Sequence, residues 1–162
     1  MADAHARLVA VDLGVRTGMA VFGGDGHLVS VGSRNLGRRG RVRQVATALR
    51  RELDRVDALV LEGDRSLAPA WQQVFGPRGT QVVLVEAERW RHELLHPRER
   101  RDARSAKAAA RQLAVVAVKE LSGRAVTPLR HDAAEAVLIG VWGLRQLGWL
   151  DAWPPGLDLR RR

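Results

Sequence analysis

Four carboxylates stand where packing alone seldom places an acidic side chain. Asp12 and Glu62 each end a short apolar run that has the composition of a strand. Asp132 and Glu135 begin an apolar stretch three residues apart, a spacing that puts both on one face of a helix. A carboxylate among apolar neighbours is costly to bury unless its charge is compensated. We therefore take these four residues as candidates for one shared acidic site.

The chemistry of such a site is the binding of hard divalent cations. Carboxylates gathered in one place repel one another, and a divalent cation relieves that repulsion. Oxygen ligands suit magnesium or manganese, which keep water and phosphate oxygens in their remaining positions. Purely structural roles are the alternative to metal binding. Asp12 could be a turn residue before Gly14, and Asp132 could be the N-cap of a helix. Cysteine is absent, which excludes disulfides, thiolate zinc sites and cysteine nucleophiles.

The charge of the chain points to a polyanionic partner. The formal net charge is +9, from 27 basic and 18 acidic residues, and the sequence pI is about 11.5. Lys107 and Lys119 are the only lysines, so nearly all of the positive charge comes from arginine. Arginine grips phosphate through two parallel hydrogen bonds, where lysine acts as a point charge. Nucleic acid is therefore favoured over an acidic protein or a membrane surface.

Apolar periodicity divides the 162-residue chain into elements that would carry the four carboxylates. Turn residues separate the first three strands, which predicts an antiparallel meander, whereas the later strands alternate with helices. The expected strands are residues 8–12, 18–22, 28–31, 58–61 and 81–85, and the expected longer helices are residues 42–56, 103–121 and 132–147. We therefore predict an α/β fold with a mixed sheet. It would form a single domain over residues 1–153, followed by a basic tail over residues 154–162 that frays.

This order of elements would bring the carboxylates together. If the strands that end at Asp12 and Glu62 are central neighbours, the two side chains meet at one end of the sheet. The helix over residues 132–147 can then close the cluster, because Asp132 and Glu135 share one of its faces. The sequence thus predicts a cluster built from distant parts of the chain.

Four pieces of the sequence occur in an order typical of one nuclease family. They are residues 9–18, residues 60–62, Trp90 and residues 131–140. In these pieces the chain resembles the RNase H-like nuclease superfamily and, within it, the RuvC-type Holliday junction resolvases. The pieces are similar to that family's opening acidic strand with its glycine turn, its second acidic strand, a tryptophan after the fifth strand and the C-terminal acidic helix. The run Ala134-Glu135-Ala136 is the form similar to the plant chloroplast resolvases.

The resemblance implies an RNase H-like fold: a mixed five-stranded sheet flanked by helices, with the first three strands antiparallel and the last two parallel to the first. It also implies two Mg²⁺ or Mn²⁺ ions about 4 Å apart at a scissile phosphate. Asp12 would bridge the ions, and Glu62 and Glu135 would complete their separate shells. The fourth residue, a metal ligand or proton-transfer group, stays open between His131 and Asp132, since family members use either register.

The activity that the resemblance implies is structure-selective cleavage of DNA. A homodimer would make paired symmetric nicks in a four-way junction and leave 5′-phosphate ends. A YqgF-like nuclease that processes precursor ribosomal RNA is the alternative enzyme, because its opening motif is similar to Gly14 and Arg16-Thr17-Gly18. The alternative from another class is a basic nucleic-acid-binding module that keeps the fold without the chemistry.

Basic residues that can contact nucleic acid occur in clusters. Arginines gather over residues 38–43, 89–104 and 160–162, and the middle cluster leads into the helix over residues 103–121. A solvated face would give the same pattern, and a groove that contacts the phosphate backbone is the interpretation that we favour. The candidates for contact are Arg16, Arg78, Arg101, Arg104, Lys107 and Arg111.

Two aromatic residues follow the second acidic strand. Trp71 and Phe75 lie where resolvases place residues that wedge into the centre of a junction. Stacking on an unpaired base contributes ~1 to 3 kcal/mol. Packing in the core or at a dimer contact is the alternative for each.

The ends of the chain and its apolar runs suggest no membrane segment. Residues 1–7 are polar and lead straight into a short apolar run, unlike a signal peptide. No apolar stretch approaches the ~20 residues of a membrane span. We therefore expect a cytoplasmic protein without a membrane partner.

Overall fold

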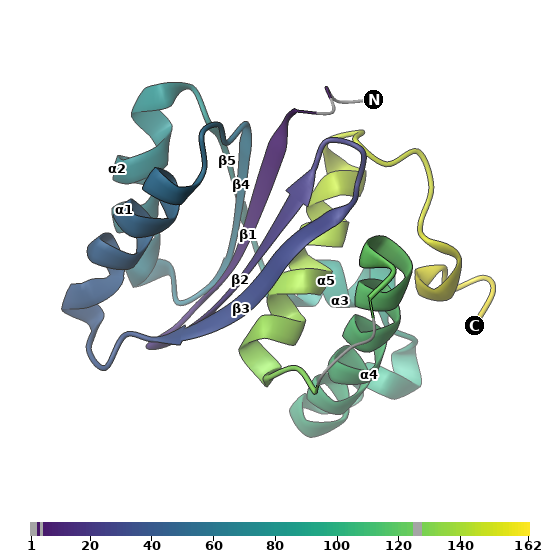
Figure 1. Ribbon diagram of the computed structural model, residues 1–162. Coiled ribbons are helices and arrows are strands. Elements are labelled where there is room, and N and C mark those ends of the chain that lie inside the picture. Colours follow the sequence, from purple (N-terminus) through teal and green to yellow (C-terminus); the bar gives the residue numbers. More distant parts are fainter. Residues whose placement is uncertain (1–2, 4, 125–127) are drawn as a thin grey trace.

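The sheet has five strands with the mixed pairing that the sequence predicted. The computed structural model describes residues 3, 5–124 and 128–162. Its strands are β1 (Arg7–Leu13), β2 (Arg16–Gly23), β3 (Leu28–Asn35), β4 (Ala58–Gly63) and β5 (Gln81–Val85). They lie in the order β3-β2-β1-β4-β5 (Figure 1). The pairs β1–β2 and β2–β3 are antiparallel, and the pairs β1–β4 and β4–β5 are parallel, which confirms the prediction.

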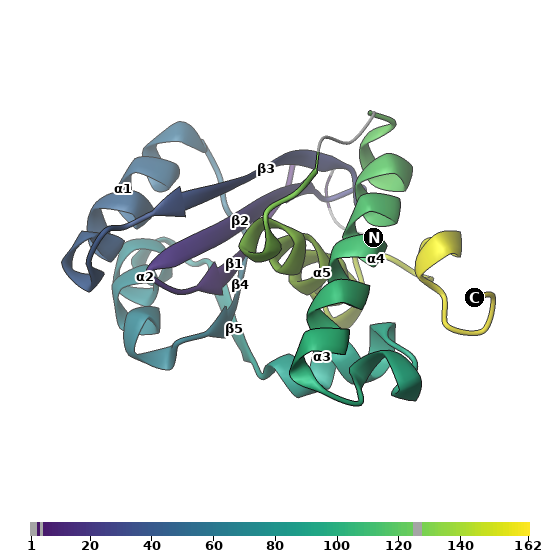
Figure 2. The same cartoon turned by 90° about the horizontal axis from the view of Figure 1, so that it is seen from below.

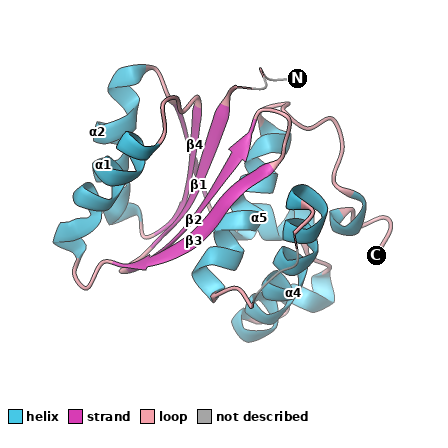
Figure 3. Ribbon diagram, in the orientation of Figure 1, coloured by secondary structure: helices cyan, strands magenta, loops and turns pink. Residues whose placement is uncertain are grey.

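Helices cover both faces of this sheet. They are α1 (Val42–Glu52), α2 (Ala68–Phe75), α3 (Ala87–Leu94), α4 (Ala103–Ser122) and α5 (His131–Gln146). The pair α1 and α2 covers one face, and α5 lies against the other with α3 and α4 packed on it (Figures 1 and 3). Among the described residues, no helix has the length and apolar character needed to cross a membrane.

Side chains of β1 alternate between two hydrophobic cores. Val9 and Val11 belong to the core under α1 and α2, whereas Leu8 and Ala10 belong to the core under α5. Successive side chains of a strand point to opposite faces. The carboxylate of Asp12 therefore falls on the face that α5 covers.

Helix α5 is buried on almost all sides. Every residue from Asp132 to Leu144 is buried. The helix lies between the sheet and α4 (Figure 2), which explains why its sequence is apolar around the whole circumference. Gly140 permits the close contact with the sheet, because a Cβ at that position would overlap the ring of Phe22. The apolar stretch predicted over residues 132–147 is thus the central helix of the fold.

Two elements, β3 and α1, end four residues away from the predicted end, a larger difference than in the other elements. Strand β3 runs to Asn35 rather than Val31, because its outer half pairs with β2 even though most of its side chains are exposed. Helix α1 ends at Glu52, since Leu53 already has an extended backbone. The buried Val56 therefore belongs to the segment before β4 and not to the helix.

The C-terminal tail packs on the domain, which corrects the expectation that it frays. Leu157 is fully buried, and the backbone N–H of Gly156 donates to the Glu120 carboxylate of α4. Near the end of the chain, Arg162 forms an ion pair with Glu99. An apolar side chain and these polar contacts hold residues 154–162, although the proline-rich and basic composition gave no sign of them.

Candidate active site

Asp12 and Glu62 stand side by side at the ends of two neighbouring strands. They are register partners in the parallel pair β1–β4. Ala58 and Val60 belong to the core under α5, so the alternation of β4 turns Glu62 to that same face. The structure therefore brings the two strand-end acids together, in front of α5.

Helix α5 adds Asp132 and Glu135 to this edge of the sheet. Its first turn lies over Gly18, the β2 residue that pairs with Asp12. A Cβ on Gly18 would overlap the backbone carbonyl of Asp132, so only glycine allows the helix to approach this closely. Both helix acids are buried, with exposed fractions of 7% for Asp132 and 5% for Glu135.

Three of the four acids form a set that fits a metal ion. Asp12, Glu62 and Glu135 each offer a carboxylate oxygen, and these oxygens all lie within 4.8 Å of one another. Glu62 is 8% exposed, whereas Asp12 is half-buried and open to the cleft described below. A set of carboxylate oxygens on this scale suits Mg²⁺ or Mn²⁺.

Burial and repulsion make this cluster a poor place for several negative charges at once. Burial raises the pKa of Asp12 to about 8, and the charges of Glu135, Glu62 and Asp132 add to the rise. Burial, followed by the charge of Glu135, raises the pKa of Glu62 to about 7. A bound cation would reverse both effects, because it favours the charged form of each ligand.

Arg91 is a member of the site that sequence reasoning did not single out. Its guanidinium, from α3, forms an ion pair with Glu135 and lies 5.1 Å from the centre of the Trp90 ring. Its charge lowers the pKa of Asp12 and of Glu62, against the larger effect of burial. In the sequence, Arg91 is one of many clustered arginines. Its position directly after Trp90 is the one feature that could have identified it as a site residue.

His131 and Asp132, the two candidates for the fourth residue, both lie at the site. The Nε2 atom of His131 is 3.5 Å from Oε2 of Glu135. Its Nδ1 atom is buried and has no hydrogen-bond partner within the described part of the chain. Asp132 instead accepts a hydrogen bond from the Ser33 hydroxyl of β3, and Nε of Arg130 lies 3.7 Å from its carboxylate. Ser33 is a second residue that sequence reasoning missed.

Acidic and basic side chains line one cleft at this site. The cleft has a volume of about 740 Å³. Asp12, Asp132, Glu135 and His131 line it together with the basic residues Arg16, Arg130, Lys107 and Arg111. The basic residues come from β2, α4 and the residue before α5, so segments distant in the sequence contribute to the lining. This arrangement can hold a phosphate group against a cation bound by the carboxylates.

Not all of the predicted nucleic-acid contacts lie at this cleft. Arg101 and Arg104 are exposed at the start of α4, but they do not line it. Arg101 is 3.4 Å from the carboxylate of Asp102. Arg78 lines a separate hollow between α1 and α2. Contact of these arginines with nucleic acid stays a prediction.

The aromatic pair after β4 packs in the core, which corrects its interpretation as a wedge. Trp71 and Phe75 are each 0% exposed, and their rings stack with centroids 6.0 Å apart. Both belong to the core beneath α1 and α2, on the face of the sheet away from the acids. Neither ring presents a face to a base, so the alternative of core packing holds for both.

Comparison with known proteins places the fold. Neither a protein-family model nor a curated protein sequence matches the chain. Among solved structures, the chain is similar to T. thermophilus RuvC in complex with a Holliday junction substrate. The TM-score is 0.61 at 15% sequence identity, and the likeness covers 90% of this chain and 98% of that one. The chain therefore has a RuvC-like form of the RNase H-like fold, as the resemblance implied.

Proposed function

We propose that this chain is a structure-selective DNA endonuclease of the Holliday-junction-resolving type, which hydrolyses phosphodiester bonds with divalent metal ions. The observation that carries the proposal is the cluster of Asp12, Glu62 and Glu135, whose oxygens lie within 4.8 Å of one another beside a basic cleft. The fold supports the choice of substrate, because the similar RuvC structure holds a Holliday junction.

The residues present fit a divalent metal centre. Asp12 would be the shared ligand of two ions, and Glu62 and Glu135 would each complete the shell of one. Burial and neighbouring carboxylates raise the pKa values of Asp12 and Glu62, and a bound divalent cation would offset both causes. When bound, Mg²⁺ or Mn²⁺ offsets negative charge on a phosphodiester and makes water more acidic.

The other side chains of the cleft would hold the substrate and move protons. Arg16, Lys107 and Arg111 line the cleft and would bind phosphates that flank the scissile bond. His131 would accept or return a proton through the ring nitrogen that faces Glu135. The Ser33 hydroxyl orients the Asp132 carboxylate, so Asp132 would act from a fixed position.

A homodimer would make the paired cuts. A four-way junction has two equivalent strands to be nicked, and the described residues of one copy hold one such acidic cluster. A twofold-symmetric dimer presents two such clusters in related positions. The proposal therefore includes a homodimer as the active form. Light scattering tests this part of the proposal, because it measures the molar mass of the protein in solution.

One cleavage experiment tests the proposed function. Purified protein is incubated with a labelled four-way junction, a linear duplex of matched sequence and a structured RNA, in Mg²⁺, Mn²⁺ or EDTA. We expect paired symmetric nicks in the junction only, and none in EDTA. Cleavage of the RNA alone would favour the YqgF-like nuclease instead. Binding of the junction without cleavage in either metal would favour the binding module.

A further inference from the structure

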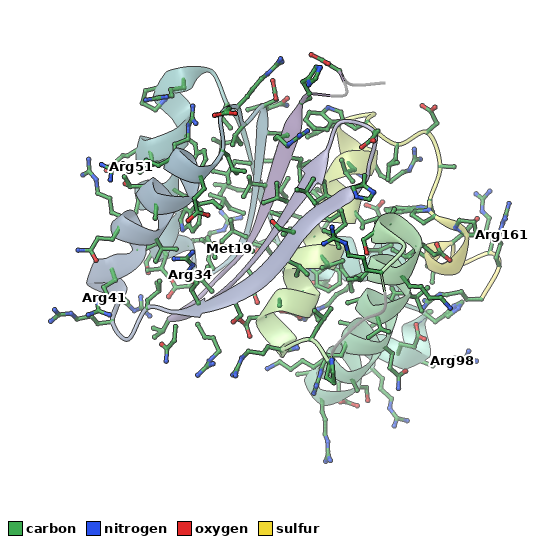
Figure 4. The ribbon with its side chains drawn as sticks, in the orientation of Figure 1. Met19, Arg34, Arg41, Arg51, Arg98 and Arg161 are labelled. Atoms are coloured by element: carbon green, nitrogen blue, oxygen red, sulfur yellow. The ribbon has the colours of Figure 1, made fainter. Side chains whose placement is uncertain are left out.

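A second basic groove lies on the face of the molecule away from the acids. It is a hollow of about 500 Å³ between α1 and the segment formed by α2 and the turn after it. Arg43, Arg50 and Arg51 of α1 line it on one side, and Gln73 and Arg78 line it on the other. Figure 2 shows α1 and α2 together on the side of the sheet opposite α5, and in Figure 4 the side chain of Arg51 projects outward from α1.

The arginines of this groove form no ion pair within the described residues. Elsewhere the chain pairs arginine with a neighbouring acid, as in Arg55–Asp57 and Arg65–Glu86. In the part of the chain that the structure describes, no ion pair involves any of the four groove arginines, which are Arg43, Arg50, Arg51 and Arg78. Asp54 is the one acid that lines the groove. With four arginines and one acid in its lining, the groove carries a net positive charge, and a concave surface of that kind attracts anions.

One of these arginines also has an unused hydrogen-bond donor. Arg50 donates from Nη1 to the backbone carbonyl of Leu53, at 2.7 Å. Its Nε is buried and has no partner among the described residues. Folding thus holds this guanidinium against the end of α1, and the arginine forms no ion pair with any described acid. A guanidinium held in this way is ordered before a ligand binds, which lowers the entropy cost of binding.

The spacing of the arginines suits a polymer of phosphates better than a single small anion. Arg43 and Arg51 are eight residues apart on α1, which corresponds to about 12 Å along the helix. One DNA strand carries a charge every ~3.4 Å of its axis, so this distance spans about three phosphates. Arg43, Arg50 and Arg51 fall on one face of the helix, because their spacing of seven and eight residues is close to two turns.

From this groove we infer that the α1–α2 face binds the phosphate backbone of nucleic acid, at a site separate from the acidic cleft. The two sites lie on opposite faces of the sheet. If the proposed function holds, the groove would contact a second arm of the branched substrate while the cleft holds the strand to be cut. The inference does not depend on cleavage, because the groove needs only backbone phosphates.

The experiment measures binding in EDTA, where no cleavage interferes. The triple variant Arg43→Gln, Arg51→Gln, Arg78→Gln changes three exposed side chains of the groove. Its matched control changes Lys119, Arg124 and Arg160 to Gln, three exposed basic residues that line neither the acidic cleft nor this groove, and removes the same charge. Affinity for a labelled linear duplex and a four-way junction is measured over a series of salt concentrations, after thermal unfolding confirms that both variants fold.

We expect the groove variant to bind the junction about tenfold or more weakly at low salt than the control variant. Its salt slope should fall by about 2 to 3 relative to the wild type, because each lost phosphate contact removes about 0.9 from the slope. Equal affinity and equal slope for the two triple variants would overturn the inference and leave the groove to another anion, such as an acidic protein. Cleavage activity does not enter this result, so the failure of one proposal is distinct from the failure of the other.

A crosslinking measurement covers the case in which the triple variant does not fold. The chain has no cysteine, so Gln73→Cys provides a unique thiol in the groove for a photoreactive label. We expect this label to crosslink to DNA. A label on Asp151→Cys, an exposed position on the other side of the sheet, serves as the control and should not. Absence of crosslinks from Gln73→Cys, at protein concentrations that saturate binding, would also overturn the inference.

Discussion

Arg91 of α3 forms an ion pair with Glu135 of α5, at the centre of the acidic cluster. The pair joins two helices that are far apart in the sequence and places a positive charge among the carboxylates. Because the charge of Arg91 lowers the pKa of both Asp12 and Glu62, the arginine supplies part of the compensation that a metal ion would complete. Four predictions follow from this relationship and from the geometry around it.

Substitution of Arg91 by glutamine should destabilise the metal-free protein. The change removes a cation from a largely buried ion pair and leaves Glu135 among other acids. Because Arg91 is partly exposed, we expect a loss of about 1 to 3 kcal/mol, or roughly 3 to 10 °C in Tm. Thermal unfolding in EDTA and in Mg²⁺ measures it. The stabilisation by Mg²⁺ should be larger for the variant than for the wild type, and an unchanged Tm in EDTA would contradict the assigned role.

The stability of the metal-free protein should fall as the pH rises from about 5 to about 8.5. The folded state raises the pKa of Asp12 from 3.8 to about 8 and that of Glu62 from 4.5 to about 7, so it holds protons that the unfolded chain releases. Stability from these protons is complete below the unfolded pKa values and is lost as the pH passes the folded ones. Tm in EDTA against pH measures the effect, and Asp12→Asn should flatten the curve. A Tm that rises over this range in EDTA would be inconsistent with the buried cluster.

Asp12→Asn should abolish cleavage while junction binding persists. The substitution keeps the shape of the side chain but removes the charge proposed to be shared between two ions. Loss of several kcal/mol of transition-state stabilisation corresponds to about a thousandfold or more in rate. Single-turnover cleavage in Mg²⁺ and binding in EDTA are measured with the same junction. Asp151→Asn, an exposed acid outside the cluster, is the control and should cut at the wild-type rate.

Gly18→Ala should loosen the site without touching any proposed metal ligand side chain. The added Cβ would overlap the backbone carbonyl of Asp132, so the first turn of α5 must move away from β2. We expect a stability loss of about 1 to 3 kcal/mol, as is usual for overpacking, together with weaker Mg²⁺ stabilisation and slower cleavage. Gly32→Ala is the matched control, because a Cβ on this β3 glycine meets nothing within 4 Å. Equal behaviour of the two variants would mean that the approach of α5 does not set the site.

The acidic site could be predicted from the sequence because its members follow strong local patterns. Asp12 and Glu62 end apolar runs that only strands of a mixed sheet explain, and parallel pairing then puts them at one edge. Glu135 stands in a helix that is apolar around its circumference, which forces the helix into the interior. Burial and strand alternation are both visible in a linear sequence, and they decided where these three carboxylates lie.

Only the tertiary structure determined the contacts between elements that are far apart in the sequence. Arg91 and Ser33 reach Glu135 and Asp132 because of the way in which α3 and β3 lie against α5, and no periodicity of their own sequence shows this. The orientation of α2 likewise put Trp71 in the core under α1, whereas its composition suited an exposed aromatic equally well. The arginine-lined groove arises in the same manner, from the packing of α2 against α1. Polar and amphipathic side chains find their partners through the relative placement of whole elements, which local sequence does not encode.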